Sequence, residues 1–402
     1  MTASSAIPVA SEELTAFLQA LVRVPSVNPP GGEGPVAALV AAKLRDLGFD
    51  VRVVEAEPGR PNVIAHKGGT GRGPTLLFNG HMDVQPAASG WTRDPFGAEI
   101  EGSRLYGRGS VDMKAGLAAM VFAADALERA GIRLAGDLVI TAVADEVSGG
   151  HKGTGFLVRE RLVSADMAVI GEPTGEQVNV CHRGALWVEI EVVGKSAHGG
   201  RPWLGVNAVS KMAKLIRAIE SDLLPGLQSR THPLVPPPTI NFGTIAGGTK
   251  FNLVADRCVL QLDRRLVPGE SIDSALREIE ATCAAVRAAD PEAWSYEVRE
   301  VMRVTPGEIS PDAPIVRACQ RAFREVTGRE AGIGATAGFE DAHFLLDAGI
   351  PTAMFGPYRR KEEDPAGRPF FTTSGMADEF VDLRDVVTGA QVYARLALNL
   401  LG

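Results

Sequence analysis

The sequence predicts an α/β protein with a mostly parallel sheet in a larger domain, into which a smaller domain is inserted. Up to about residue 182, segments of β-strand composition alternate with amphipathic helical segments. That alternation is typical of parallel strands joined by covering helices. From about residue 183 the order changes to β-α-β-β-α-β, and the first pattern resumes after about residue 302. We therefore expect 1–182 with 302–402 as one domain, and 183–301 as the inserted one.

The larger domain begins with two predicted helices. Ser11 precedes apolar residues at helical spacing and is a plausible N-cap. A second helix over Val36–Leu47 is followed by Gly48, a common helix end. A third helix is expected over Asp112–Ala130. The predicted strands of this part are Phe49–Val54, Asn62–His66, Thr75–Phe78, Asp137–Val143 and Asp166–Ile170.

The inserted segment reads as a split βαβ unit, the ferredoxin-like arrangement. The expected strands and helices, in chain order, are Leu186–Val193, the helix Val206–Leu223, Thr239–Ile245, Asn252–Leu262, the helix Ser271–Ala288 and Trp294–Val301.

Composition excludes several classes of partner. The 402 residues include 41 Lys and Arg against 49 Asp and Glu, a net charge of −8. Nucleic acid and anionic membranes both attract basic surfaces, so neither is expected as a partner. The four widely spaced cysteines and the start MTASSAIPVASEEL predict reduced thiols and no secretory signal. We expect a cytoplasmic protein that binds a small molecule.

Metal-ligating residue types follow three predicted strands. His81 and Asp83 come after LLFNG, Glu146 after DLVITAVA, and Glu172 after DMAVIG, while Asp112 opens a predicted helix. Ligands in open α/β sheets bind at such strand ends. One histidine with several carboxylates suits zinc, manganese or cobalt. Alone, Asp112 would be read as a helix cap and Glu172 as a turn residue; their joint occurrence indicates a metal site.

Seven stretches of the chain form a recognisable series: NGHMDVQP, LYGRGSVDMKAG, TAVADEVSGGHKGT, VIGEPTG, GKSAHGGRPWLGVNA, GGTKFNLVADRC and DRRLVPGE. In this order they resemble the zinc aminoacylase/carboxypeptidase family, which includes aminoacylase, glutamate carboxypeptidase, acetylornithine deacetylase and succinyl-diaminopimelate desuccinylase. The resemblance implies a catalytic α/β domain with a ferredoxin-like lid that often forms dimers. It thus implies a homodimer that pairs through residues 183–301.

The resemblance also implies roles for individual residues. His81, Asp112 and Glu172 match metal ligands, Asp83 matches the residue that orients His81, and Glu146 matches the general base that activates water. In the lid, His198 matches a residue that stabilises the oxyanion in the partner subunit. Asn252 and Arg265 match lid residues that contact substrate.

The chain departs from the family pattern at three positions. Val147 and Gly375 stand where the family has the two ligands private to a second metal. We therefore expect one ion per active site. An alignment gap would instead make Asp145 the base and Glu146 a ligand. His343 replaces an arginine that grips a substrate carboxylate. It is expected to bind substrate, to fill the vacant metal site or to be an exposed structural histidine.

Three functions remain open from the sequence. The first is hydrolysis of an amide bond in an N-acyl amino acid or small peptide-like substrate. The second is a one-metal aminohydrolase that releases ammonia from an aromatic or amidine-like carbon. The third is a non-catalytic binding protein on the same fold, which the retained Glu146 and His198 disfavour because a binding protein needs no base.

Overall fold

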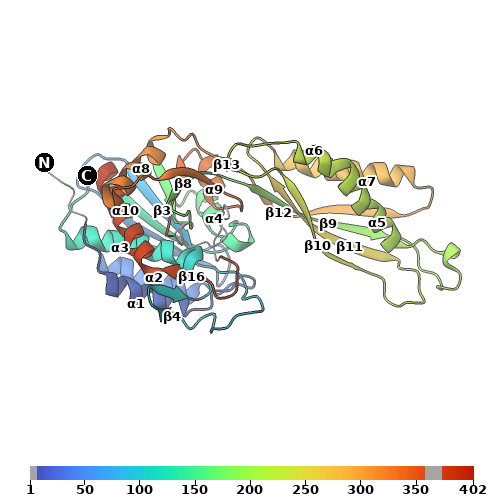
Figure 1. Cartoon of the computed structure of the whole chain (residues 1–402), viewed down its shortest axis with the longest axis horizontal. Helices are drawn as coiled ribbons and strands as arrows, with labels where there is room; N and C mark the ends of the chain where they lie inside the picture. Colours follow the sequence, from blue (N-terminus) through green and yellow to red (C-terminus); the bar gives the residue numbers. More distant parts are fainter. Residues whose placement is uncertain (1–6, 358–373) are drawn as a thin grey trace. The chain divides into compact units, whose positions relative to one another are not determined.

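The computed structural model describes residues 7–357 and 374–402. The chain divides into two compact units (Figure 1). The described residues of the first unit fall within Met1–Val180, Glu308–Thr336 and Glu340–Gly402. Those of the second unit are Cys181–Gly307 and Ala337–Phe339.

A mixed sheet forms the centre of the first unit. Its strands are β1 (Asp50–Glu55), β2 (Pro61–Lys67), β3 (Thr75–His81), β6 (Asp137–Val143), β7 (Met167–Ile170), β8 (Gln177–His182), β13 (Gly307–Glu308), β14 (Gly332–Thr336) and β15 (Thr352–Met354). The order is β1-β2-β6-β3-β7-β15-β8-β13, with β14 beside β8. The central strands β6, β3, β7 and β15 are parallel, which confirms the predicted fold class. The β1–β2 and β2–β6 pairs are antiparallel, a direction that strand composition does not encode.

Helices cover both faces of this sheet. Leu77 of β3 packs in one core cluster with Leu157 and Leu345, whereas the ring of Phe78 lies 5.2 Å from that of Tyr393. Successive strand residues point to opposite faces, so these helices lie on different sides. The helices of this unit are α1 (Ser11–Val22), α2 (Gly34–Asp46), α3 (Ala115–Arg129), α4 (Thr154–Arg159), α8 (Pro314–Thr327), α9 (Ala342–Asp347) and α10 (Leu383–Leu401).

The helix predicted from Asp112 begins three residues later, at Ala115. Asp112 lies in an irregular turn, η1 (Ser110–Lys114), with φ −124° and ψ 101°, so its backbone is extended. Buried Lys114 fixes this turn by donating to the carbonyl oxygens of Leu21 and Val24 at 2.9 and 2.8 Å. The turn comes after β4 (Glu99–Glu101) and β5 (Arg104–Tyr106) in the chain. These two strands form a small sheet with β16 (Phe380–Asp382). Asp112 is therefore positioned by a loop and is not a helix cap.

The second unit is a four-stranded antiparallel sheet covered by helices. Its elements are β9 (Gly184–Val193), η3 (Pro202–Leu204), α5 (Ala208–Ala218), η4 (Ile219–Leu223), α6 (Leu224–Gln228), β10 (Thr239–Gly247), β11 (Arg257–Leu266), α7 (Ile272–Ala289) and β12 (Ser295–Val304). The strand order β10-β11-β9-β12 and the intervening helices α5 and α7 give the predicted βαββαβ topology. Its core joins Ile190 and Leu260 of the sheet to Met212 and Ile279 of the helices.

The strand predicted over Asn252–Leu262 was placed too early, since β11 begins at Arg257. The backbone before it pairs with another loop: the Gly199 N–H donates to the Asn252 carbonyl at 2.7 Å, and the Val254 N–H donates to that of Ala197 at 2.8 Å. Leu253 and Ala255 extend the apolar alternation of β11 towards the N-terminus, but they lie before the strand and outside the sheet.

All four cysteines are buried, and none of them forms a disulfide. Among the described residues, no helix combines the length and the apolar character that spanning a bilayer requires.

Buried His182 makes the stability of the fold depend on pH. Burial lowers its pKa from 6.5 to about 4, although a contact of Nδ1 with the Arg183 carbonyl raises it. Between these values the unfolded chain binds a proton that the folded chain does not. We expect the free energy of unfolding to fall as pH drops from 6.5 towards 4, by up to about 3 kcal/mol. Denaturant titrations across this range should show a weaker pH dependence for His182→Asn; parallel curves for both chains would contradict the prediction.

Candidate active site

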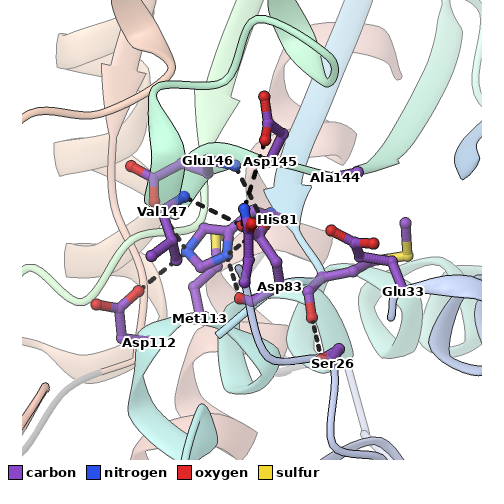
Figure 2. Close-up of polar contacts among 12 residues, drawn as sticks. Ser26, Glu33, His81, Asp83, Asp112, Met113, Ala144, Asp145, Glu146 and Val147 are labelled. Atoms are coloured by element: carbon purple, nitrogen blue, oxygen red, sulfur yellow. Dashed lines mark hydrogen bonds and ion pairs between the residues drawn. The ribbon is translucent and has the colours of Figure 1, made fainter. Parts of the chain in front are cut away.

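Three parallel strands bring the predicted ligands to one edge of the sheet. His81 is the last residue of β3, while Glu146 and Glu172 follow β6 and β7. Because β6 and β7 flank β3 with parallel register, their carboxyl ends lie side by side. Asp112 reaches the same place from η1 (Figure 2).

Three carboxylates converge on one nitrogen of His81. Its Nε2 lies 3.0 Å from Asp112 Oδ1, 3.4 Å from Glu172 Oε1 and 3.7 Å from Glu146 Oε2. The possible ligand atoms of His81, Glu146 and Glu172 all lie within 4.8 Å of one another. Asp112 contacts His81 but is not part of this compact group, which consists of His81, Glu146 and Glu172. The residues of the metal prediction and the predicted base therefore occupy one cluster.

The other nitrogen of His81 is held by Asp83. Nδ1 lies 2.8 Å from the Asp83 carbonyl oxygen and 3.6 Å from its carboxylate. The Asp83 carbonyl and the Asp112 carboxylate can only accept, so Nδ1 donates to Asp83 and Nε2 donates to Asp112 Oδ1. Although burial lowers the pKa of His81, the surrounding carboxylates raise it well above its ordinary value, and a divalent ion would take the place of the proton on Nε2. The Asp83 carboxylate instead accepts from Asn28 at 2.8 Å and from the backbone N–H groups of Glu146 and Val147, each at 3.2 Å. Asp83 therefore contacts both the histidine and the loop that carries the predicted base.

Negative charge dominates the cluster. Burial raises the pKa of Glu146 well above its ordinary value, and the charge of Glu172 raises it further, although His81 lowers it. Burial also raises the pKa of Glu172, and the charge of Asp112 adds to the effect. Acidic groups that crowd one imidazole in this way are stabilised by a divalent cation. Imidazole nitrogen and carboxylate oxygen are donors that zinc, manganese and cobalt accept, so these residues fit a metal ion.

Asp145 is directed away from this cluster (Figure 2). One carboxylate oxygen accepts from Arg60 at 3.2 Å and from Asn28 at 3.4 Å. The other accepts from the Lys152 N–H at 3.1 Å. Its backbone is left-handed, with φ 76°, which aspartate tolerates better than most residues. Both oxygens are thus engaged in holding the loop, and this arrangement favours Glu146 over Asp145 as the base.

Val147 and Gly375 line one small cavity beside Asp112. The cavity is also lined by Gln85, Arg108, Ser374 and Glu379. Glu379 is paired with Arg108 at 2.5 Å and accepts from the Val111 N–H at 3.1 Å. Valine and glycine offer no side-chain ligand atom there.

The sequence-based analysis missed several polar residues around the cluster. Ser374 donates to Asp112 Oδ2 at 2.5 Å, and Asn28 holds Asp83. Two buried acids follow β14: burial raises the pKa of Asp341 to about 7, and burial with the charge of Glu172 raises that of Glu340. Ser374 could have been noticed because it precedes the atypical Gly375. The contact of Asn28 with Asp83 had no such signal, because it joins distant segments.

The predicted substrate-contacting residues have different surroundings. In the second unit, exposed His198 forms a β-bridge with Leu253, next to Asn252, while Arg265 in β11 donates to Asp263 at 2.9 Å. In the first unit, His343 is buried in α9, with Nδ1 3.0 Å from the Glu340 carbonyl and its ring 3.8 Å from that of Phe344. Contact of any of these residues with substrate stays a prediction.

Comparison with known proteins decides the family. The sequence pattern of peptidase family M20/M25/M40 matches residues 77–399. The chain belongs to this family. Membership agrees with the resemblance noted from the motifs, and it makes this protein a metallohydrolase that acts on amide C–N bonds and uses a divalent metal.

Individual M20 relatives match over most of the chain. An N-formyl-4-amino-5-aminomethyl-2-methylpyrimidine deformylase of Halalkalibacterium halodurans is 29% identical over 377 residues, covering 86% of this chain and 87% of the relative. A succinyl-diaminopimelate desuccinylase of Methylorubrum extorquens is 32% identical, covering 85% and 90%. A dinuclear metal-binding M20 peptidase of Bacillus subtilis shares the fold, with a TM-score of 0.68, 15% identity and coverage of 97% and 98%.

Proposed function

We propose that this enzyme hydrolyses the amide bond of an N-acyl amino acid or a small peptide-like substrate, with one divalent ion per active site and Glu146 as general base. The convergence of Asp112, Glu146 and Glu172 on Nε2 of His81 carries the proposal. The relatives support the substrate class, since a desuccinylase and a deformylase both remove an acyl group from an amine.

The residues divide into ligands and a base. His81, Asp112 and Glu172 would hold the ion, which when bound polarises a carbonyl and lowers the pKa of water. Glu146, which lies in the compact group with His81 and Glu172, takes a proton from the attacking water as hydroxide adds to the carbonyl carbon. It then delivers that proton to the leaving nitrogen as the C–N bond breaks. The products are a carboxylic acid and an amine.

We also propose that the second unit is a lid and that it pairs with a second copy of the chain. Several of its large apolar side chains are exposed: Trp203 is 75% exposed and Phe251 fully so, and Leu204 and Leu253 are exposed too. Trp203 and Leu204 lie in η3, and Phe251 and Leu253 lie in the loop before β11. The hydrogen bond from the Gly199 N–H to the Asn252 carbonyl joins that loop to the segment before η3. Exposed apolar groups gathered in this way are typical of an interface between proteins. The buried cysteines, which form no disulfide, support a cytoplasmic location, because reduced thiols persist there.

Adding metal back to the stripped enzyme tests the function and the metal count together. After chelation and dialysis, we expect no hydrolysis of N-acetyl, N-succinyl or N-formyl amines. Adding Zn²⁺, Mn²⁺ or Co²⁺ should restore hydrolysis of at least one of these substrates, with activity reaching its maximum at one equivalent per chain. The measurement is the amine released, followed against the added metal.

Other outcomes identify the alternatives. Ammonia released from arylamine or amidine substrates, without amide cleavage, would show the aminohydrolase. Maximal activity only at two equivalents would contradict the one-ion site. Metal binding without turnover of any substrate would favour the binding protein.

A further inference from the structure

The two oxygens of Asp112 face different partners. Oδ1 lies 3.0 Å from His81 Nε2, on the side of the proposed ion. Oδ2 accepts a hydrogen bond from the Ser374 hydroxyl at 2.5 Å. A carboxylate that is held at both oxygens cannot rotate freely about its terminal bond. The orientation of Oδ1 towards the proposed ion therefore depends on the bond at Oδ2.

The cavity on the Ser374 side is poorly suited to a cation. Val147 and Gly375 lack ligand atoms, and the carboxylate of Glu379 is already paired with Arg108. Gly375 has φ 74°, and a Cβ at this position would lie 3.2 Å from the Gln85 side-chain oxygen. A larger ligand-bearing residue would be strained there. Among the residues that the structure describes, Ser374 is thus the hydrogen-bond donor to Asp112 Oδ2 on this side.

We propose that Ser374 is a positioning residue that takes the place of a second cation on Asp112 Oδ2 and so orients Oδ1 towards the single ion. This inference rests on the proposed function. The hydroxyl provides a directed hydrogen bond where a dinuclear site would provide a positive charge. Removing a residue that hydrogen-bonds to a metal ligand typically weakens metal binding about 10- to 100-fold.

The test compares metal binding by the full chain and by Ser374 variants. Competition with a chromogenic chelator measures the Kd for Zn²⁺, and absorption of the Co²⁺-loaded protein reports ligand geometry. We expect Ser374→Ala to bind one equivalent about 10- to 100-fold more weakly and to change the Co²⁺ spectrum. Ser374→Thr retains the hydroxyl and should restore both properties. The matched control is Ser103→Ala, which removes a 3.0 Å serine–aspartate bond to Asp382 and should leave both unchanged.

The outcomes separate this inference from the proposed function. If the wild-type chain binds no divalent ion, the proposed function fails. If the wild-type chain binds one ion and Ser374→Ala binds it equally tightly with an unchanged spectrum, only the role of Ser374 is overturned. Two equivalents in the wild-type chain would also overturn it, since Ser374 would then not stand in place of a second cation. If Ser374→Ala does not fold, Ser374→Gly provides the comparison, because it also removes the hydroxyl and adds no metal ligand.

Discussion

Glu146→Gln is expected to lower turnover by about 100-fold or more while the chain still binds one divalent ion. General-base catalysis is typically worth about 10²- to 10⁴-fold. Glutamine keeps the size of the side chain but cannot take a proton from water. The backbone bond from Glu146 to the Asp83 carboxylate, at 3.2 Å, is unaffected by the substitution. Steady-state kinetics with the best amide substrate and metal analysis of the same preparation make the measurement.

A surface substitution provides the control for this prediction. Glu176 pairs with Arg329 at 2.6 Å, and Glu176→Gln should keep wild-type turnover. Near-wild-type turnover in Glu146→Gln would mean that another residue is the base. Loss of the ion together with activity would instead make Glu146 a ligand, as its place in the compact group with His81 and Glu172 allows.

His198→Ala is expected to lower turnover by about 100- to 1000-fold, the usual value of one oxyanion donor. The local geometry suits donation. Nδ1 of His198 accepts from the Gly200 N–H at 3.0 Å, so the proton of the neutral ring is on Nε2. The side chain is exposed, as a donor to a substrate must be before the substrate binds. Metal content should stay unchanged, because His198 is not a proposed ligand.

Mixing two inactive chains tests whether His198 acts in the partner subunit. If it does, a dimer of one Glu146→Gln chain and one His198→Ala chain has one complete site. Random exchange makes about half of the dimers mixed, so the mixture should recover about a quarter of wild-type activity. A mixture that stays inactive despite proven subunit exchange would place His198 in its own subunit's site or outside catalysis. A monomer in solution would contradict the same proposal.

The sequence predicted the fold and the residues of the cluster for one physical reason. Parallel strands end at a common edge, so His81, Glu146 and Glu172 could be grouped from strand positions alone. Asp112 was selected by residue type, but its expected helical position was wrong, since loop geometry there depends on Lys114 and distant carbonyls. Ser374 was missed because its contact joins segments that are 262 residues apart. Residue type predicts donor chemistry, whereas such contacts depend on the folded chain.

The contacts of Asp83 tie together two parts of the catalytic machinery. Its carbonyl holds His81, and its carboxylate holds the amides of Glu146 and Val147. A displacement of the end of β3 therefore carries the base along with the histidine. One residue, through its carbonyl on one side and its carboxylate on the other, links the histidine to the loop of the base. Sequence drift elsewhere in the sheet can thus move the whole centre as a unit while the distance that matters for proton transfer is preserved.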